Sequence, residues 1–592
     1  MTSGASTTVF IVEAPGALPP PWDGMPVDIC VDESTSLSAV AQLRYLDPDR
    51  ALLAATGISI GTPLTIRVKR ADEAAPLPLF TGEVVALEAE FDGAGSFTTV
   101  RALDLSHRLR RGRRITGFVG RKASDIAAAV AAGAGIPVGH IDETATTYPL
   151  RTQPNVSDWE FLASLAEEND REVVVENGRF HFRSPVPASS APEGSTSAAQ
   201  SPYVVEMGEN VLAIRSSVTS VNQVGTVRVR GWDVQQKKAL LSEVSVQAGA
   251  GPLVGLDPAK AVRPFPAAEL LVADVPYRTD AEVQAVSAAL AAELAAAVAE
   301  LEITVLGNPR LRVGTPIALT GAGRPFDGKY TVTAARHSDE LGIGYHTWVT
   351  VSGRQDRTAY GLATGAAAPA RSPRVPGVAV GVVTDIQAPT ELAGQGWVRL
   401  TFPWLSEATG GDPAYVSDWV RTVQLGGAGG GGVFSPEVHD EVLVAFEQGL
   451  LDRPYVIGGL YNGVDQPTED ELALVDDGTG KVNRRSFASR SGHRIELLDA
   501  AAGPAGIRLR THEDRLSVHL DQQNTVITVH SDGKVTVSAS EEVTVTGQGI
   551  TLDAGSGALT LTGESVSVSG KTGLSLDGGA QCSIKGEIVK LN

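Results

Sequence analysis

The sequence predicts a mainly β protein that ends in a long, narrow β structure shared by several copies of the chain. Apolar residues recur as alternating pairs through the last hundred residues, at steps of 8, 8, 7, 9, 7 and 8 residues. Glycines stand between the pairs, where the backbone must turn tightly. No proline follows Pro504 and no aromatic residue follows Phe487, so these segments can line only a narrow core.

The alternation within each pair is the period-2 pattern of a strand with one buried face. A lone ribbon of such strands would leave that face in water, so we expect identical chains, three being the favoured number, to form a needle around a shared core. The needle is expected over 487–592, after a connector at 463–486. Its expected core residues are Ile527, Val529, Val535, Val537, Val543, Val545, Ile550, Leu552, Leu559, Leu561, Val566, Val568, Leu574 and Leu576.

Residues 1–360 show short strand patterns with a few helices between them. Clear strands are expected at Thr65–Lys69, Gly82–Glu88 and Thr226–Trp232. Capping residues predict three helices, which span Ile126–Ala132 after Ser124-Asp125, Trp159–Glu168 after Ser157-Asp158, and an Ala-rich stretch from Thr279-Asp280 to about Glu300. The Ser-, Ala- and Pro-rich segment Ser184–Ser201 is expected to be a loop or a disordered insert.

A compact β module is expected at 377–462, after a linker at 361–376. Its strand patterns include Trp397–Phe402, Asp418–Val423 and Glu441–Phe446. Five short strands in a segment of this length predict a small barrel of the oligonucleotide/oligosaccharide-binding (OB) type.

Composition and charge exclude several classes of function. The chain has 592 residues, 42% of them apolar, and a net charge of −20, which argues against a nucleic-acid binder. Its two cysteines, Cys30 and Cys582, are expected to be free thiols in a reducing compartment. No secretory signal is recognised at the N-terminus, so we expect assembly in the cytoplasm and, if the protein leaves the cell, another route.

Three glycine patterns resemble catalytic or nucleotide-binding motifs, but none predicts such chemistry. Gly57–Gly61 has the G-x-S-x-G spacing of hydrolases but leads into a strand pattern. Gly426–Gly432 has a dinucleotide-like spacing with no helix after it, and Gly478–Lys481 lacks parts of a phosphate loop. We therefore expect no enzyme activity, no catalytic residues and no cofactor.

Charged and aromatic residues offer weaker candidates. The basic run Arg108–Arg114 is interpreted as a solvated face or as a contact to a neighbouring subunit or acidic partner. His519 and His530 could meet on a three-fold axis, but alternation places them outside the needle, so no metal site is expected. Trp404 and Trp419 are interpreted as core or interface residues of the barrel.

Motifs in order along the chain resemble valine-glycine repeat protein G (VgrG) and phage baseplate spikes. Those of the β module are Phe402–Trp404, Asp418–Arg421, Gly426–Gly432, Glu441–Phe446, Arg453–Gly458 and Tyr461–Gly463. The upstream part is similar to the phage late-control hub at Phe80–Val84, Asp158–Leu162, Leu165–Glu168, Gly307–Leu311, Gly314, Phe326–Tyr330, Thr333 and His337. Ser489–Leu497 resembles the start of the family's needle.

The resemblance implies a homotrimeric spike of a contractile injection system. Each chain would supply two hub β-barrel-type domains, an OB-fold barrel and one strand of an intertwined triple-stranded β-helix. The implied partners are inner-tube and hub proteins, other baseplate proteins, a tip protein of the proline-alanine-alanine-arginine (PAAR) kind and, in some systems, an effector cargo. The tip protein would contact Ile588, Val589, Leu591 and Asn592.

The sequence departs from the family by having no lysozyme-like domain before the needle and no effector domain after it, which favours a dedicated structural spike. Its Ala- and Gly-rich composition favours, weakly, a phage-tail-like or extracellular particle over a type VI secretion VgrG. The alternatives are a β-helical polysaccharide-degrading tailspike, which would need two positioned carboxylates in a groove, and a fibrous adhesin, which would not need a hub-like first half.

Overall fold

The structure, a computed structural model, describes residues 8–590 except residues 25, 36, 72 and 222 and the segments 248–252, 256–257, 353–373 and 406–414. Most of the expected linker at 361–376 thus lies outside the described residues. The chain divides into two units, Met1–Asp465 and Gln466–Asn592.

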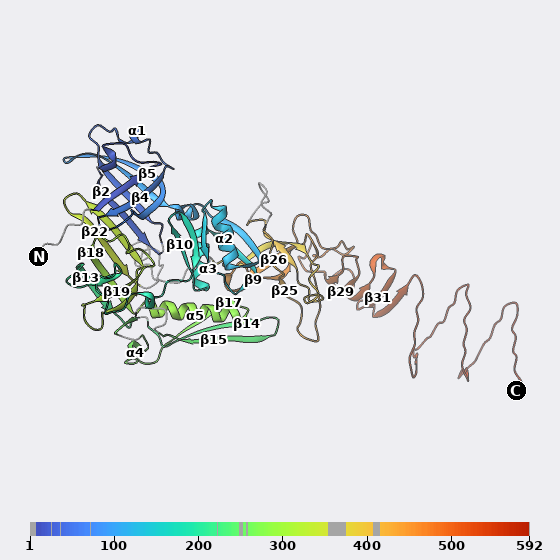
Figure 1. The fold of residues 1–592 in the computed structure, drawn as a ribbon. Coiled ribbons are helices and arrows are strands. Elements are labelled where there is room, and N and C mark those ends of the chain that lie inside the picture. Colours follow the sequence, from blue (N-terminus) through green and yellow to red (C-terminus); the bar gives the residue numbers. More distant parts are fainter. Residues whose placement is uncertain are drawn as a thin grey trace. The chain divides into compact units, whose positions relative to one another are not determined.

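The first unit is organised around a ten-stranded sheet (Figure 1). In spatial order its strands are β1 (Thr8–Glu13), β4 (Pro63–Arg70), β5 (Leu77–Asp92), β6 (Gly95–Asp104), β3 (Val40–Leu46), β2 (Pro26–Ser34), β21 (Ala334–Glu340), β22 (Gly344–Val351), β18 (Ala299–Leu306) and β13 (Val211–Val218). Two separate cores pack against it, one built by β1–β6 and one around β18 and β22. Antiparallel pairing of β2 with β21 therefore joins the two expected hub subdomains into one sheet.

Smaller sheets complete the hub region. They are β7 (Arg114–Lys122) with β9 (Thr147–Val156); β10 (Glu172–Glu176), β11 (Arg179–Arg183) and β8 (Val138–Ile141); β12 (Val204–Glu206), β19 (Pro316–Thr320), β20 (Gly328–Thr331) and β16 (Leu253–Val254); and β15 (Lys238–Ser245), β14 (Thr226–Asp233) and β17 (Glu269–Tyr277). The segment 184–201 contains one short 3-10 helix, Ala188–Ser190, in agreement with the expected loop.

The helices of the described chain are α1 (Leu52–Thr56), α2 (Ala123–Gly133), α3 (Asp158–Glu168), α4 (Pro258–Val262) and α5 (Asp280–Ala296). The predicted caps of α3 and α5 are confirmed, because Ser157 and Thr279 each accept a hydrogen bond from the N–H three residues later. Helix α2 instead begins earlier than expected, after Lys122, whose backbone N–H is bonded by Asp125.

The prediction that the Ala-rich helix continues to Glu300 is wrong. The helix ends at Ala296, and Ala299 already belongs to β18, which pairs with β13 on one side and β22 on the other. Two ladders of hydrogen bonds and a buried alternating face outweigh the helix preference of a few alanines, which is a small effect per residue.

The barrel is a five-stranded sheet, as predicted. Its order is β24 (Arg399–Thr401), β23 (Val378–Asp385), β26 (Glu441–Phe446), β27 (Pro454–Gly459) and β25 (Arg421–Thr422). Phe402 lies at the centre of its core, fully buried, with ring contacts to Tyr415 and Phe446. Leu150 of β9 belongs to the same core, so the barrel and the hub share apolar packing.

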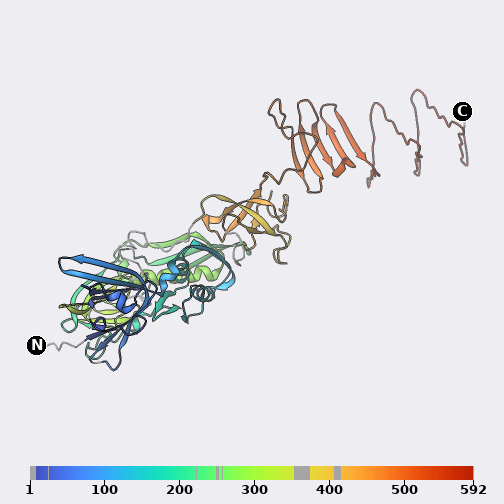
Figure 2. The same ribbon diagram turned by 90° about the horizontal axis from the view of Figure 1, so that it is seen from above.

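The second unit begins with an antiparallel meander (Figure 2). Its strands are β28 (Arg484–Ala488), β29 (Arg494–Asp499), β30 (Ala505–Arg510), β31 (Leu516–Asp521) and β32 (Val526–Ser531). Residues 533–590 follow as extended runs with turns and form no strand with another described residue. The short β segments predicted after residue 531 are thus absent as paired strands in the single chain, because a strand needs a neighbour for its hydrogen bonds.

Phe402→Ala should destabilise the barrel by about 3–5 kcal/mol, since it opens a cavity in a closed core. Faster amide hydrogen exchange in β23 and β26 of the full-length protein would report this loss. The matched substitution is Val423→Ala, at a side chain that is 59% exposed, and it should cost less than about 0.5 kcal/mol. Equal effects of the two changes would contradict this description of the core.

Candidate functional site

The hydrolase-like serine lies in an ordinary turn. Ser59 is placed between α1 and β4, an order of helix, turn and strand that is the reverse of a nucleophile elbow. Its backbone N–H donates to Thr62 Oγ1 at 3.0 Å. The glycine run of the barrel is also a turn, in which the Gly426 and Gly431 backbones approach so closely that a Cβ on Gly426 would lie 2.7 Å from Gly431 Cα.

The basic run is largely used inside the chain. Arg108 binds Glu83, Arg114 pairs with Asp158, and the Arg110 guanidinium lies 4.0 Å from the centre of the Trp159 ring. Arg111 and Arg113 are exposed. The expected contact to a neighbouring subunit or acidic partner therefore remains a prediction for Arg111 and Arg113, whereas a change at Arg110 would also disturb the fold.

Trp404 and Trp419 lie at the edge of the barrel. The indole N–H of Trp404 donates to Val380 O at 3.1 Å, and its side chain is 49% exposed. Arg399 lies over the Trp419 ring, 5.1 Å from its centre. Both contacts are consistent with the expected structural role.

The loop 307–312 ties the two hub subdomains together. Arg310 pairs with Glu73 and Arg312 with Glu33, so two arginines of the second subdomain bind acids of the first. Gly307 is required here, since a Cβ would lie 2.0 Å from the Tyr345 ring. Nearby His337 is fully buried, and burial together with Arg312 lowers its pKa to about 3. It is therefore a neutral structural residue.

Ion pairs also connect the hub to the barrel. Arg278 binds Glu447, Arg453 binds Glu282, and the hydroxyl groups of Thr152 and Tyr415 lie 3.0 Å apart. Together with the shared apolar core, these contacts make the hub and barrel one continuous body of packed residues.

The meander β28–β32 has an uncovered apolar face. Strand register places alternate residues of all five strands on this face, next to one another across each ladder. They are Phe487, Ile495, Leu497, Ile507, Leu509, Val518, Leu520, Ile527 and Val529. Val518 is half-buried, and the other eight are between 39% exposed, at Leu520, and 71% exposed, at Ile527, in the single chain. A contiguous patch of this kind marks a surface that binds something.

The apolar pairs beyond the meander are exposed as well. Val535, Val545 and Leu576 are 55%, 67% and 69% exposed, and the other predicted core residues of this stretch lie in the same range. At the end of the described chain Ile588 and Val589 are 78% and 50% exposed, whereas Leu591 and Asn592 lie outside the described residues. The needle core and the tip contact therefore both stay predictions.

Histidines of the meander lie opposite the apolar face, as the alternation predicted. His519 pairs across strands with Arg508 and Thr528, and His530 binds Asp532 at 3.1 Å. His519 is nevertheless half-buried, because this face is partly covered. Among the described residues no group of three potential metal ligands occurs.

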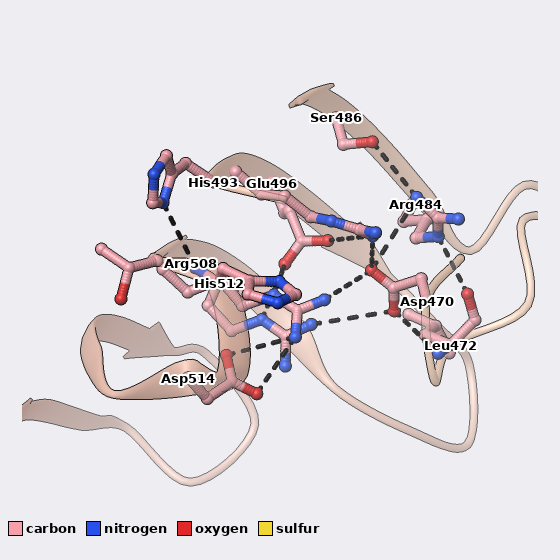
Figure 3. Close-up of polar contacts among 12 residues, drawn as sticks. Asp470, Leu472, Arg484, Ser486, His493, Glu496, Arg508, His512 and Asp514 are labelled. Carbon is pink, nitrogen blue, oxygen red and sulfur yellow. Dashed lines mark hydrogen bonds and ion pairs between the residues drawn. The ribbon is translucent and has the colours of Figure 1, made fainter. Parts of the chain in front are cut away.

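The polar face of the meander is covered by the connector, and a cluster of buried charged residues lies between the two (Figure 3). This cluster was not predicted from the sequence. Asp470 of the connector and Glu496 of β29 have side chains with no exposed surface. Arg494 and Arg510 bind Asp470, and Arg508 and Arg510 bind Glu496, with Nε–Oε2 distances of 2.8 and 3.0 Å.

Backbone contacts complete the cluster. Arg484 Nε donates to Leu472 O at 2.8 Å, and Arg494 donates to the carbonyl of Glu469. Every arginine of the cluster thus comes from the sheet. Several of the oxygen atoms that accept their hydrogen bonds belong to the connector. The connector segment 469–472 is held against the polar face by these bonds.

The charge state of Asp470 follows from its neighbours. Burial on its own would raise the pKa of this carboxyl group, but the interaction with Glu496, the N–H of Leu472 and the charges of Arg484 and Arg510 lower it to about 2. Asp470 therefore stays ionised at neutral pH and balances part of the arginine charge.

Asp470→Asn should loosen the connector and destabilise the meander by about 3–5 kcal/mol, since it leaves buried arginines short of a partner. Hydrogen exchange in β29 and β30 of the full-length protein measures the change. Asp477→Asn, at an exposed position of the same connector, should have almost no effect, and a similar loss there would contradict the role given to Asp470.

Low pH should reduce the stability of the meander β28–β32. Because the pKa of Asp470 is lowered from 3.8 to about 2, its contribution of about 2 kcal/mol is complete above pH 4 and disappears as the pH falls through 2. Stability of the meander measured between pH 5 and 2 should therefore fall more steeply in the native protein than in Asp470→Asn. Parallel curves would exclude Asp470 as the titrating group.

Family comparisons identify two regions of the chain. Residues 379–461 match the model described as the type VI secretion system/phage-baseplate injector OB domain. Residues 64–340 match a second model, described as the Alg8 N-terminal domain. No curated protein matches the sequence.

Solved structures show a similar fold. A chain of the Francisella PdpA–VgrG complex aligns over 89% of this chain and 80% of its own length, with a TM-score of 0.51 and 8% identity. The E. coli c3393 protein, a type VI secretion component described as similar to phage T4 gp27 and gp5, aligns over 76% and 99%, with a TM-score of 0.47 and 13% identity. The 43 kDa tail protein of prophage MuSo2 from Shewanella oneidensis covers 58% and 98%, with a TM-score of 0.42 and 15% identity.

At these identities the structural likeness concerns the fold, while the family match identifies the barrel itself. The barrel, the hub sheet and the ordered motifs agree with the resemblance found in the sequence. Residues 379–461 form an injector OB domain of the type VI secretion and phage-baseplate kind, and the chain as a whole is similar in fold to a VgrG chain.

Proposed function

We propose that the protein is the homotrimeric spike of a contractile injection system. Sheath contraction elsewhere in the particle would supply the work, and the spike would transmit force through its needle to the target envelope. The observation that supports this most strongly is the set of apolar side chains between Phe487 and Leu576, which the single chain leaves in water. Three copies related by a three-fold axis would cover it with identical surfaces.

The different environments of the two faces of the meander β28–β32 fit a structural role for the needle. Its polar face is occupied by the connector through the Asp470–Glu496 cluster, so the apolar face is the one left for other copies. In residues 533–590 the extended backbone has free N–H and C=O groups that a neighbouring chain could pair with. Interchain hydrogen bonds and a dry core would then give the stiffness that puncture requires.

The hub would join the inner tube, and the needle end with Ile588 and Val589 would seat a tip protein of the PAAR kind. Both assignments rest on the family resemblance and on the exposure of these two side chains. We infer a role without enzyme activity, in which the protein assembles in the cytoplasm and is then incorporated in the particle, with release outside the cell as a later step. The described residues contain no helix with the length and apolar character that a membrane crossing needs.

A substitution in the needle core tests the trimer directly. Val545→Asp is harmless in a monomer, where this side chain is 67% exposed, but in a trimer it buries three like charges near one axis, which is very costly. We expect light scattering to give three times the chain mass of 61.6 kDa for the native protein and a loss of trimer for Val545→Asp.

Thr546→Asp should leave the trimer intact, because successive residues of a strand point to opposite faces and Thr546 would lie on the outer one. A native protein that is a stable monomer would instead favour the single-chain β-helical tailspike. A Val545→Asp variant that stays trimeric with an unchanged melting temperature would contradict the assignment of the core.

A further inference from the structure

The series of apolar pairs continues beyond Leu576, where the expected needle core ended. Cys582 and Ile584 form a further pair, eight residues after Leu574 and Leu576, and eight is the commonest step of the series. The residues that alternate with this pair are polar, namely Gln581, Ser583 and Lys585. In the single chain Cys582 is exposed and Ile584 is 66% exposed. This run therefore has the same one-sided pattern as the earlier pairs and is equally uncovered.

The turn before this pair repeats the geometry of an earlier turn of the same segment. In the earlier turn Asp553 Oδ1 accepts the N–H of Gly555 at 2.8 Å, and Gly555 has a φ of 55°. In the later turn Asp577 Oδ1 accepts the N–H of Gly579 at 2.9 Å, and Gly579 has a φ of 57°. One backbone hydrogen bond closes each turn, at 2.8 and 3.0 Å. Each turn starts directly after one apolar pair and leads to the next, so the backbone agrees with the spacing.

The charges around this pair are compatible with other copies of the same segment as its cover. Residues 577–590 contain two acidic and two basic side chains, so identical segments placed side by side carry no net charge, although the whole chain carries −20. Like-charge repulsion therefore does not oppose their association. The pair also keeps the period of the surface proposed above to face other copies, and an unrelated partner would give no reason for that period.

We infer that Cys582 and Ile584 extend the shared core of the trimer, with the three Cys582 thiols facing one another near the three-fold axis. This inference rests on the proposed trimer and adds where its core ends. The surface left for a tip protein would then begin after Ile584. A thiol enclosed in this way is sheltered from alkylating and oxidising reagents, whereas the same thiol in a single chain is exposed to them.

Thiol alkylation tests the position of Cys582 without a substitution in the core. The full-length protein is treated with N-ethylmaleimide, labelling is followed by peptide mass spectrometry, and the mass of the same sample is measured by light scattering. The matched variant is Ser583→Cys in a Cys582→Ser background, which moves the thiol to the outer side of the run. In the trimer we expect Cys582 to react at least about tenfold more slowly than the thiol introduced by Ser583→Cys.

The mass and the labelling rates together separate the two proposals. Equal labelling rates in a trimeric sample would overturn the inference about Cys582 and leave the proposed spike in place. A monomeric sample would overturn both.

Substitutions at the same two positions test the apolar character of the site. Cys582→Val should leave hydrogen exchange of residues 577–590 unchanged, because it keeps an apolar side chain of similar size. Cys582→Asp would bury three carboxylates and should accelerate this exchange at least about tenfold. Ser583→Asp should have no such effect. Equal effects of Cys582→Asp and Ser583→Asp, or an effect of Cys582→Val as large as that of Cys582→Asp, would overturn the inference.

Discussion

Apolar side chains on one face of a β segment have to be covered, and the second unit of this protein cannot cover them alone. Five strands of the meander present a continuous apolar face, and the apolar pairs after Ser531 continue the same pattern without a partner strand. Burial of such surface is the dominant favourable term in association. The proposed trimer, its needle and its mechanical role all depend on this one requirement.

Which face remains open is decided by electrostatics. Asp470 and Glu496 are completely buried among four arginines of the sheet, and these bonds hold the connector over the polar side. A buried ion cluster contributes little net stability but is costly to break, so it acts mainly to define one arrangement. With the polar side occupied, the apolar face is the side left for the proposed trimer.

Contacts across the domain boundaries join the two hub subdomains and the barrel. A single sheet passes through both hub subdomains, the loop 307–312 adds two ion pairs across their boundary, and Leu150 extends the barrel core into the hub. Such joints resist bending because separating them would expose apolar surface and buried charges together.

The sequence by itself determined the features that rest on local patterns. Alternation identified the strands of the barrel, and Ser157 and Thr279 marked two helix starts, because period and capping are properties of short segments. The needle core that the later apolar pairs predict stays a prediction. Tertiary structure decided the rest. Strand pairing placed Ala299 and Glu300, which were expected in the helix, in strand β18, and the fold brought Asp470 to arginines up to 40 residues away. Contacts between distant segments depend on which surfaces meet, and no local pattern encodes that choice.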